Sequence, residues 1–260
     1  MRLTQQIIKV GFRMVETGLS DGTSGNISVR CPEGPYILIT PSARDFRLLT
    51  ERDLVSIDLQ TGEAIGRRKP SSEWRLHLAI HRARPDVNAV IHHHATWASA
   101  VAVARKSIPV LIDEAADIGP IPTAPYAPSA TDELAINAAR EFANGSNAIL
   151  LANHGAVVVG RSLPEALRRA LESERLAQIF VGAQSLGGAQ GLDELQVTVN
   201  RKFFEGYRDA ENYRPLPPAS SDIAGPVRFE DLVSYSFRAG ITFASLVQHL
   251  ILQRLHKVGS

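Results

Sequence analysis

The pattern of apolar and polar positions predicts a chain that alternates helices with short strands. Apolar residues recur at helical spacing over residues 4–16, which predicts an amphipathic helix. Three strands are expected next, at 27–30, 36–39 and 54–58, and only short turns separate them. Because strands follow one another without long helices between them, the sequence predicts an antiparallel or mixed sheet, not a doubly wound parallel one.

The region from Ser71 to His94 joins a helix to a buried strand. Ser71 or Ser72 is expected to cap the helix, which should end before Pro85. The run 89–91 then reads as a strand that leads into three consecutive histidines. Further elements are expected as a helix at 97–105, an edge strand within 121–126, a helix at 132–143, a strand at 148–152, a hairpin partner at 156–160 and helices at 162–187, 196–208 and 242–257.

His92 and His94 are the first candidates for metal binding. A strand places residues i and i+2 on the same face, so these two imidazoles can point at one ion while His93 faces away. Two imidazoles suit zinc or a similar divalent metal, and Glu73 can join them if its helix packs back on the strand. His154, at the end of another strand, would complete a set of three imidazoles. The alternative is that these histidines are solvated or structural.

Small polar residues at the ends of predicted elements form a candidate anion site. They offer accessible backbone N–H groups and hydroxyls, and a helix N-terminus favours a phosphate. Ordinary turn chemistry is the alternative, since the same residue types crowd turns. The candidates are Gly25, Asn26, Ser42, Ala43, Ser71 and Ser72.

Composition and charge narrow the class of protein. The chain has 260 residues, with 28 Lys and Arg against 27 Asp and Glu, so nothing favours nucleic acid or a membrane as partner. The single Cys31 excludes an internal disulfide and agrees with a reducing compartment. With no long apolar run and no signal-peptide pattern, a cytoplasmic protein is expected. The proline-rich stretch at 215–218 predicts a domain over 1–213 and a linker with a helical tail over 214–260.

Five motifs follow one another in order along the chain. They are Ser-Gly-Asn at 24–26, Ile-Thr-Pro-Ser at 39–42, Ser-Ser-Glu-Trp-Arg at 71–75, Arg-Pro-Asp-Val-Asn-Ala-Val-Ile-His-His-His at 84–94 and Asn-His-Gly at 153–155. This ordered set resembles the class II aldolase/adducin family, and most closely its fuculose-phosphate aldolase branch. The resemblance covers about residues 3–210.

The resemblance implies a fold, an assembly and a site. It implies an α/β fold of the α+β type, with a central, mostly antiparallel sheet flanked by helices, and a homotetramer with active sites between subunits. It implies a zinc ion on Glu73, His92, His94 and His154, although manganese, cobalt or iron also suit such ligands. It further implies that the candidate anion site named above holds the substrate phosphate. Ala43 stands where the family usually has glycine.

The activity implied is cleavage of a ketose 1-phosphate to dihydroxyacetone phosphate and an aldehyde. The metal would act as Lewis acid, and Glu73 as base once substrate displaces it. In the fucose branch a tyrosine from the neighbouring subunit handles protons, and its match here is Asp113, which is a departure. A second tyrosine of that branch matches Tyr207.

Other activities within the family stay open as alternatives. Dehydratases of methylthioribulose phosphate use a glutamate that Glu114 matches in position, although they lack the Ser-Ser-Glu motif found here. Epimerases carry Asp in place of Glu73. Decarboxylation of a phosphorylated keto acid ranks third, and a non-catalytic adducin-like scaffold ranks last because all four ligands are present.

Overall fold

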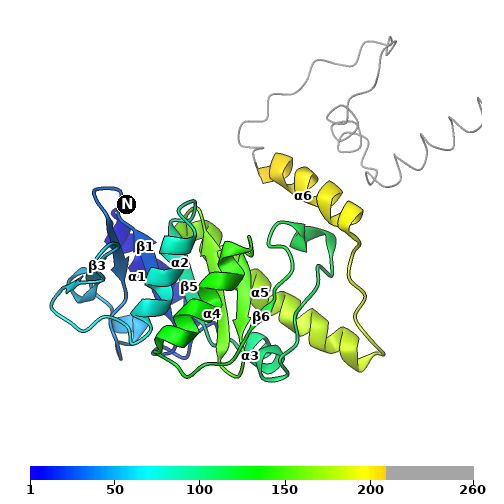
Figure 1. Ribbon diagram of the computed structural model, residues 1–260, viewed down its shortest axis with the longest axis horizontal. Coiled ribbons are helices and arrows are strands. Elements are labelled where there is room, and N and C mark those ends of the chain that lie inside the picture. Colours follow the sequence, from blue (N-terminus) through cyan, green and yellow to red (C-terminus); the bar gives the residue numbers. More distant parts are fainter. Residues whose placement is uncertain (209–260) are drawn as a thin grey trace, which may run out of the picture. The chain divides into compact units, whose positions relative to one another are not determined.

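The structure is a computed structural model, and it describes residues 1–208 (Figure 1). Residues up to Arg201 form one compact unit, which carries every candidate site residue except Tyr207. The predicted linker at 215–218, the tail helix at 242–257 and the boundary after residue 213 lie outside the described residues.

The observed helices and strands follow the predicted ones closely. The α-helices are α1 (Leu3–Glu16), α2 (Trp74–Ala83), α3 (Thr96–Val103), α4 (Asp132–Ala143), α5 (Leu163–Ser185) and α6 (Glu194–Arg208). The strands are β1 (Asn26–Arg30), β2 (Tyr36–Ile39), β3 (Val55–Asp58), β4 (Ala64–Ile65), β5 (Ala89–His93), β6 (Thr123–Ala124), β7 (Ala148–Leu151) and β8 (Gly155–Gly160). Short 3-10 helices lie at Phe46–Leu48, Glu51–Asp53 and Asp113–Ala116.

These strands form one eight-stranded sheet in the order β4-β3-β2-β1-β5-β8-β7-β6. Each pair of neighbours is antiparallel except β6 and β7, which are parallel. β6 lies at an edge of the sheet. Pro122 and Pro125, which flank it, predict this position, because proline has no backbone N–H to donate to a neighbouring strand. The expected α/β fold with a mostly antiparallel sheet is confirmed.

Helices cover both faces of the sheet. In Figure 1, α2 and α4 lie on the near face, where Ile80 and Phe142 pack with Val90 of β5. α1, α3 and α5 cover the other face, where Ile91 belongs to the larger apolar cluster. Side chains alternate along β5, so His92 follows Val90 towards α2 and His93 follows Ile91 towards α5.

Two local details differ from the predictions. α2 begins at Trp74 with Glu73 as its N-cap residue, so neither serine caps the helix itself. The Oγ atom of Ser71 instead accepts from the backbone N–H of Glu73 at 3.2 Å and so stabilises the turn before the helix. The two-residue strand β4 was not predicted, since both of its residues are exposed and show no alternation.

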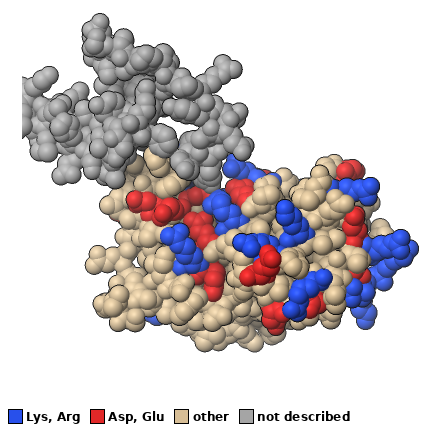
Figure 2. All heavy atoms as spheres, turned by 180° about the vertical axis from the view of Figure 1, so that it is seen from behind, with Lys and Arg blue, Asp and Glu red and all other residues tan. Residues whose placement is uncertain are grey.

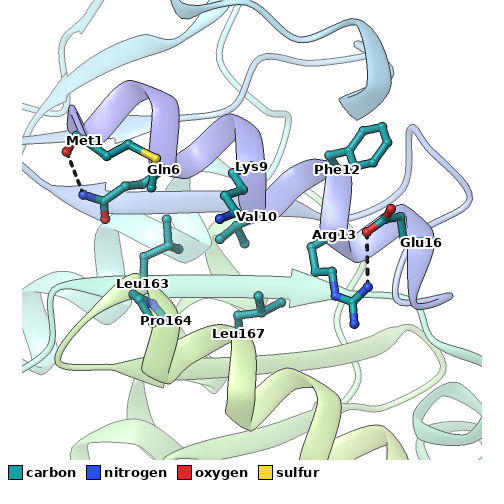
Figure 3. Close-up of a pocket in the computed structure, with 10 residues that line it drawn as sticks. All are labelled: Met1, Gln6, Lys9, Val10, Phe12, Arg13, Glu16, Leu163, Pro164 and Leu167. Atoms are coloured by element: carbon teal, nitrogen blue, oxygen red, sulfur yellow. Dashed lines mark hydrogen bonds and ion pairs between the residues drawn. The ribbon is translucent and has the colours of Figure 1, made fainter.

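Two surface features do not overlap the candidate site. A groove between α1 and the start of α5 is lined by Val10, Phe12, Leu163 and Leu167 together with charged residues at its rim (Figure 3). None of the candidate site residues lines it.

On the face seen in Figure 2, basic and acidic side chains are interspersed, with no extended patch of one sign.

Candidate active site

Four side chains from separate parts of the chain meet at one point. The ligand atoms of Glu73, His92, His94 and His154 all lie within 4.8 Å of one another. The Nε2 atoms of His92 and His94 are 2.7 Å apart, and Glu73 Oε2 lies 3.0 Å from His92 Nε2. The distance from Glu73 Oε1 to His154 Nε2 is 3.4 Å. The predicted set of three imidazoles and one carboxylate is therefore assembled in space.

Two glycines allow the surrounding backbone to approach β5. A Cβ atom on Gly25, whose φ is +79°, would lie 2.5 Å from the carbonyl oxygen of His92. A Cβ atom on Gly155 would lie 2.5 Å from the carbonyl oxygen of His93 and 2.9 Å from His94 Cδ2. Any larger residue would displace the strand that carries the two imidazoles.

His154 reaches the cluster from the turn between β7 and β8. Its neighbour Asn153 has φ +57°, a left-handed conformation that asparagine tolerates better than most residues. Asn153 Oδ1 accepts from Arg105 Nε at 3.0 Å, and the N–H of His154 donates to the carbonyl of Leu151 at 3.0 Å. These contacts fix the turn and so aim the imidazole.

Burial and charge compete within the cluster. Burial opposes ionisation of Glu73, but the charge of His92 outweighs it, so the pKa of Glu73 lies well below its usual value. Burial disfavours the imidazolium of His92, yet the Glu73 carboxylate raises the pKa of His92 above its ordinary value. Burial and the charge on His92 lower the pKa of His94 and of His154 to about 4. At neutral pH the latter two imidazoles therefore keep a free lone pair.

The donor set fits a divalent metal. His92 Nδ1 lies 2.9 Å from the carbonyl oxygen of Ala156, to which only an N–H can donate, so Nε2 is the nitrogen that faces the cluster. Glu73 Oε1 is buried and has no hydrogen-bond partner among residues 1–208. Tetrahedral zinc with bonds of about 2.0–2.2 Å needs ligand atoms roughly 3.3 Å apart. The three separations given above, 2.7, 3.0 and 3.4 Å, are close to this value. A buried oxygen without a donor beside three converging nitrogens is the arrangement that a metal ion satisfies.

The comparisons with known proteins agree with this geometry. Residues 5–181 match the family described as Class II Aldolase and Adducin N-terminal domain. The chain belongs to this family. The chain is 41% identical to L-fuculose phosphate aldolase of Escherichia coli strain K12 over 182 residues, which cover 69% of this chain and 83% of that protein.

Two further relatives illustrate the range of this class II aldolase family. The chain is 37% identical over 221 residues to the 5-methylthioribulose-1-phosphate/5-deoxyribulose-1-phosphate aldolase of Rhodospirillum rubrum, covering 84% of this chain and 97% of that protein. A solved structure of L-fuculose 1-phosphate aldolase superposes with a TM-score of 0.75 at 36% identity, covering 78% of this chain and 96% of that one. The predicted membership and its closest branch are therefore confirmed.

The loops with the candidate phosphate contacts are tied together in this class II aldolase family member. The backbone N–H of Ser42 donates to the carbonyl of Lys69 at 3.1 Å, and that of Ser71 donates to the carbonyl of Thr40 at 3.0 Å. Ser72 follows in the same turn. Gly25 precedes β1, and Asn26 is the first residue of that strand. The Asn26 side chain links them to the cluster, because its Nδ2 donates to Glu73 Oε2 at 3.1 Å.

Ala43, the departure from the family's usual glycine, adopts φ +53°. This left-handed conformation costs a residue with a Cβ atom about 1–2 kcal/mol. The backbone shape that glycine would give is thus kept, with strain.

Asp113 and Glu114 of this chain do not join its cluster. Both are exposed in the 3-10 helix Asp113–Ala116, and Asp113 Oδ1 accepts from Asn200 Nδ2 of α6 at 2.7 Å. In the part of the chain that the structure describes, no hydrogen bond or ion pair connects either carboxylate to the metal candidates. Tyr207 lies on α6.

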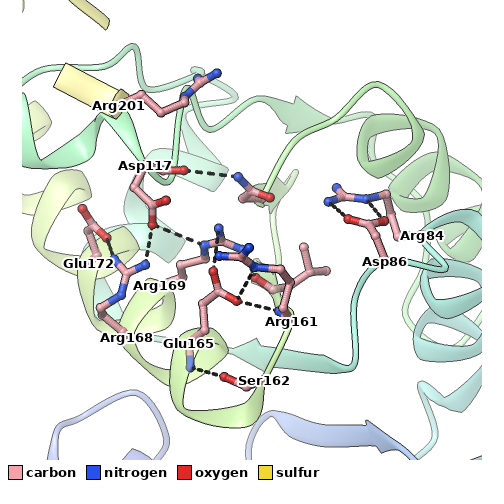
Figure 4. A network of polar contacts seen from close by, with 12 residues as sticks. Arg84, Asp86, Asp117, Arg161, Ser162, Glu165, Arg168, Arg169, Glu172 and Arg201 are labelled. Atoms are coloured by element: carbon pink, nitrogen blue, oxygen red, sulfur yellow. Dashed lines mark hydrogen bonds and ion pairs between the residues drawn. The ribbon is translucent and has the colours of Figure 1, made fainter. Parts of the chain in front are cut away.

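The segment after Glu114 is anchored to α5 by a polar network (Figure 4). Asp117 accepts from Arg168 and lies 3.9 Å from Arg169 Nε. The buried Arg169 also donates to the carbonyl of Val159 at 2.8 Å and pairs with Glu165 at 3.1 Å. Asp113 and Glu114 are therefore held on a fixed part of the surface.

A second group of polar side chains, which the sequence pattern did not predict, lies behind the cluster. Ser28 Oγ lies 2.7 Å from His77 Nδ1 and 2.9 Å from His81 Nε2, and His77 Nε2 contacts Asn26 Oδ1. A spacing signal was available: Glu73, His77 and His81 are four residues apart and so share one helical face.

Proposed function

We propose that this protein is a metal-dependent aldolase, a carbon–carbon lyase that cleaves a ketose 1-phosphate into dihydroxyacetone phosphate and an aldehyde. The observation that carries the proposal is the meeting of Glu73, His92, His94 and His154 at one point in a chain of the class II aldolase family.

We assign the four clustered side chains to a zinc ion. Three imidazoles and one carboxylate are the ligands of tetrahedral zinc sites, although the donor types also suit manganese, cobalt or iron. When bound, a divalent metal supplies a Lewis acid for the ketose oxygens on which negative charge develops during cleavage.

The chain's own residues then divide the remaining work. Glu73 takes up the proton of the C4 hydroxyl as the C3–C4 bond breaks, and a proton is then returned to C3 to give dihydroxyacetone phosphate. The donor contact from Asn26 holds the Glu73 carboxylate. The backbone N–H groups and hydroxyls of three tied loops hold the substrate phosphate. These loops carry Gly25, Asn26, Ser42, Ala43, Ser71 and Ser72.

The proposed substrates are ketose 1-phosphates of the kind that the relatives' names state. They are fuculose 1-phosphate, or a pentulose 1-phosphate with a 5-deoxy or 5-methylthio end. Both classes share the dihydroxyacetone phosphate half, which the metal and phosphate contacts hold. They differ in the aldehyde half.

The proposed assembly is a cytoplasmic homotetramer with active sites between subunits. It is supported by the family resemblance and by the exposure of Asp113 and Glu114, which reach no metal ligand of their own subunit. With Tyr207, these two residues are candidates for contacts across such a boundary. No helix among residues 1–208 is long and apolar enough to cross a membrane. Multi-angle light scattering should give about four times the 28.3 kDa chain mass, and a monomer at micromolar concentration would contradict the assembly.

The decisive experiment compares two carboxylates and identifies the product. Wild type should release dihydroxyacetone phosphate from one or more ketose 1-phosphates in a panel, as seen by coupled reduction with glycerol-phosphate dehydrogenase. Glu73→Gln should lose about 10²- to 10⁴-fold in turnover, the usual contribution of a positioned acid–base group. Glu114→Gln should cost much less.

The dehydratase alternative makes the opposite forecast. Dehydration leaves the carbon chain whole and forms a diketone phosphate, and Glu114 would be the essential carboxylate. The aldolase assignment would be overturned by a product that keeps the whole carbon chain of the substrate, together with an inactive Glu114→Gln and an active Glu73→Gln.

A further inference from the structure

A file of buried polar side chains runs from the candidate metal cluster into the space between β1 and α2. It begins at Glu73, passes through Asn26 and His77 to Ser28, and ends at His81. Asn26, Ser28, His77 and His81 are each at most 4% exposed, so solvent cannot replace any of these contacts. None of the last three residues has a part in the chemistry described above.

The direction of every hydrogen bond in this file follows from its first member. The Glu73 carboxylate can only accept, so Asn26 donates from Nδ2 and is left with Oδ1 as an acceptor. His77 must therefore donate to Asn26 from Nε2–H. Burial lowers the pKa of His77 to about 3, so this imidazole is neutral and its Nδ1 carries a lone pair.

The same logic continues to the end of the file. Because His77 Nδ1 accepts, the Ser28 hydroxyl must donate to it and is left to accept from His81 Nε2–H. The backbone of Val87 also acts on the His81 imidazole, but Nδ1 is buried and forms no well-aligned hydrogen bond among the described residues, so the file ends there. Every donor in it points towards Glu73.

We propose that His77 is a positioning residue for the reaction: with Ser28 and His81 behind it, it fixes the orientation of the Asn26 amide and thereby aims the Glu73 carboxylate. The inference rests on the proposed function, because it assigns a purpose to the orientation of Glu73. Its physical basis is local and needs no substrate.

The reason that an orienting partner is needed lies in the symmetry of an amide. A buried asparagine can turn by half a rotation and exchange Oδ1 for Nδ2, which would place a carbonyl oxygen against the Glu73 carboxylate. His77 Nε2–H opposes this turn, because it would then face an N–H instead of an acceptor. A buried donor without an acceptor costs about 1–3 kcal/mol, so the file holds the amide in the orientation that donates to Glu73.

The first test reads the tautomers directly. In the full-length protein labelled with ¹⁵N-histidine, long-range ¹H–¹⁵N correlation spectra at pH 7 distinguish protonated from unprotonated ring nitrogens. His77 and His81 should both be neutral with the proton on Nε2, and His77→Gln and His81→Gln spectra assign the signals. An imidazolium at either position, or a proton on Nδ1 of His77, would overturn the proposal.

The second test separates positioning from packing. In His77→Asn the shorter amide can contact Ser28 but cannot reach Asn26, whereas in His77→Gln the amide nitrogen extends about as far as imidazole Nε2. We expect His77→Asn to lose about 10- to 100-fold in kcat, the usual effect of removing an outer-sphere partner, and His77→Gln to recover most of it. KM and the metal content should change less than kcat in both.

Ser173→Ala is the matched control on the opposite face of the sheet. It removes a buried contact of the same kind, the 3.0 Å contact from Ser173 Oγ to His93 Nε2, and should leave kcat within about threefold of wild type. Two results would show that packing alone explains the loss of kcat. One is an equal loss in His77→Asn and His77→Gln, and the other is a loss in Ser173→Ala as large as that in His77→Asn.

Failure of the proposed function would look different. If wild type releases no dihydroxyacetone phosphate from any ketose 1-phosphate, the aldolase assignment fails. The tautomers of His77 and His81 then decide alone whether the hydrogen-bonded file exists as described. If the tautomers are wrong but cleavage is observed, the inference fails and the function stands.

Discussion

At the scale of single residues, three consecutive histidines show how position on a strand decides chemistry. His92 and His94 converge on Glu73, while His93 points to the other face, where its Nε2 contacts Ser173 Oγ at 3.0 Å. The alternation of side chains along a strand predicted this division. It could not predict the partner of His93, because Ser173 lies 80 residues away on α5.

Metal content tests the residue assignments. His92→Ala and His154→Ala should each lose most of the bound ion, because only two imidazoles would remain beside the Glu73 carboxylate. Glu73→Gln should keep much of it, since three imidazoles remain. Elemental analysis after gentle purification should find about one divalent ion per wild-type chain, with Glu114→Gln as the matched control. Full retention in both alanine variants would refute the site.

The strain at Ala43 predicts a stabilising substitution. Ala43→Gly should raise the free energy of unfolding by about 0.5–1 kcal/mol, because relief of the left-handed conformation exceeds the added entropy of the unfolded chain. Denaturant unfolding measures the change. Ala79→Gly, in the middle of α2, is the control and should lower the stability by about 0.5–1 kcal/mol. A loss of stability in Ala43→Gly would mean that Ala43 is not strained.

At the scale of elements, periodicity accounts for what the sequence could predict. α4 begins and ends at the predicted residues, because its apolar stripe and its Thr131 cap are both local signals. β4 was missed because a two-residue, exposed strand has no period to detect. The contacts of Ser28 with His77 and His81 were also missed, because they depend on the packing of α2 against β1, which no local pattern contains.

The close approach of β8 to β5 gives an element-scale prediction. Gly155→Ala should lower the free energy of unfolding by about 1–3 kcal/mol and weaken metal binding, because the new methyl group meets the backbone of His93, which cannot move alone. Thermal unfolding and elemental analysis measure the two effects. Gly182→Ala is the control: it lies within α5 with nothing within 4 Å of the new Cβ atom and should be neutral or stabilising. Equal effects of the two substitutions would contradict this account of the site.

At the scale of the whole molecule, buried neutral histidines lie on both faces of the central sheet. His77 and His81 lie on α2 and are buried against Ser28 of β1, and His93 of β5 is buried against Ser173 of α5. Each is kept neutral by burial, whereas each becomes exposed and free to bind a proton when the chain unfolds. The protein therefore carries a built-in sensitivity to acid that does not depend on its activity.

His93 allows the sign and size of this sensitivity to be tested. Burial, with the charges of His92 and His94, lowers the pKa of His93 to about 3 in the folded chain, whereas an unfolded histidine titrates near 6.5. The contribution of neutral, buried His93 to stability is complete above about pH 6.5. It is lost as the pH falls from about 6.5 towards 3, because in this range the unfolded state binds a proton at His93 and the folded state does not. The slope is about 1.4 kcal/mol per pH unit for one histidine. The free energy of unfolding can be measured by denaturant titration between pH 4.5 and 6 with a chelator present. As the pH falls, it should decrease less steeply in His93→Gln than in wild type, by about 1.4 kcal/mol per pH unit. Parallel pH dependences in the two proteins would show that His93 is not held neutral.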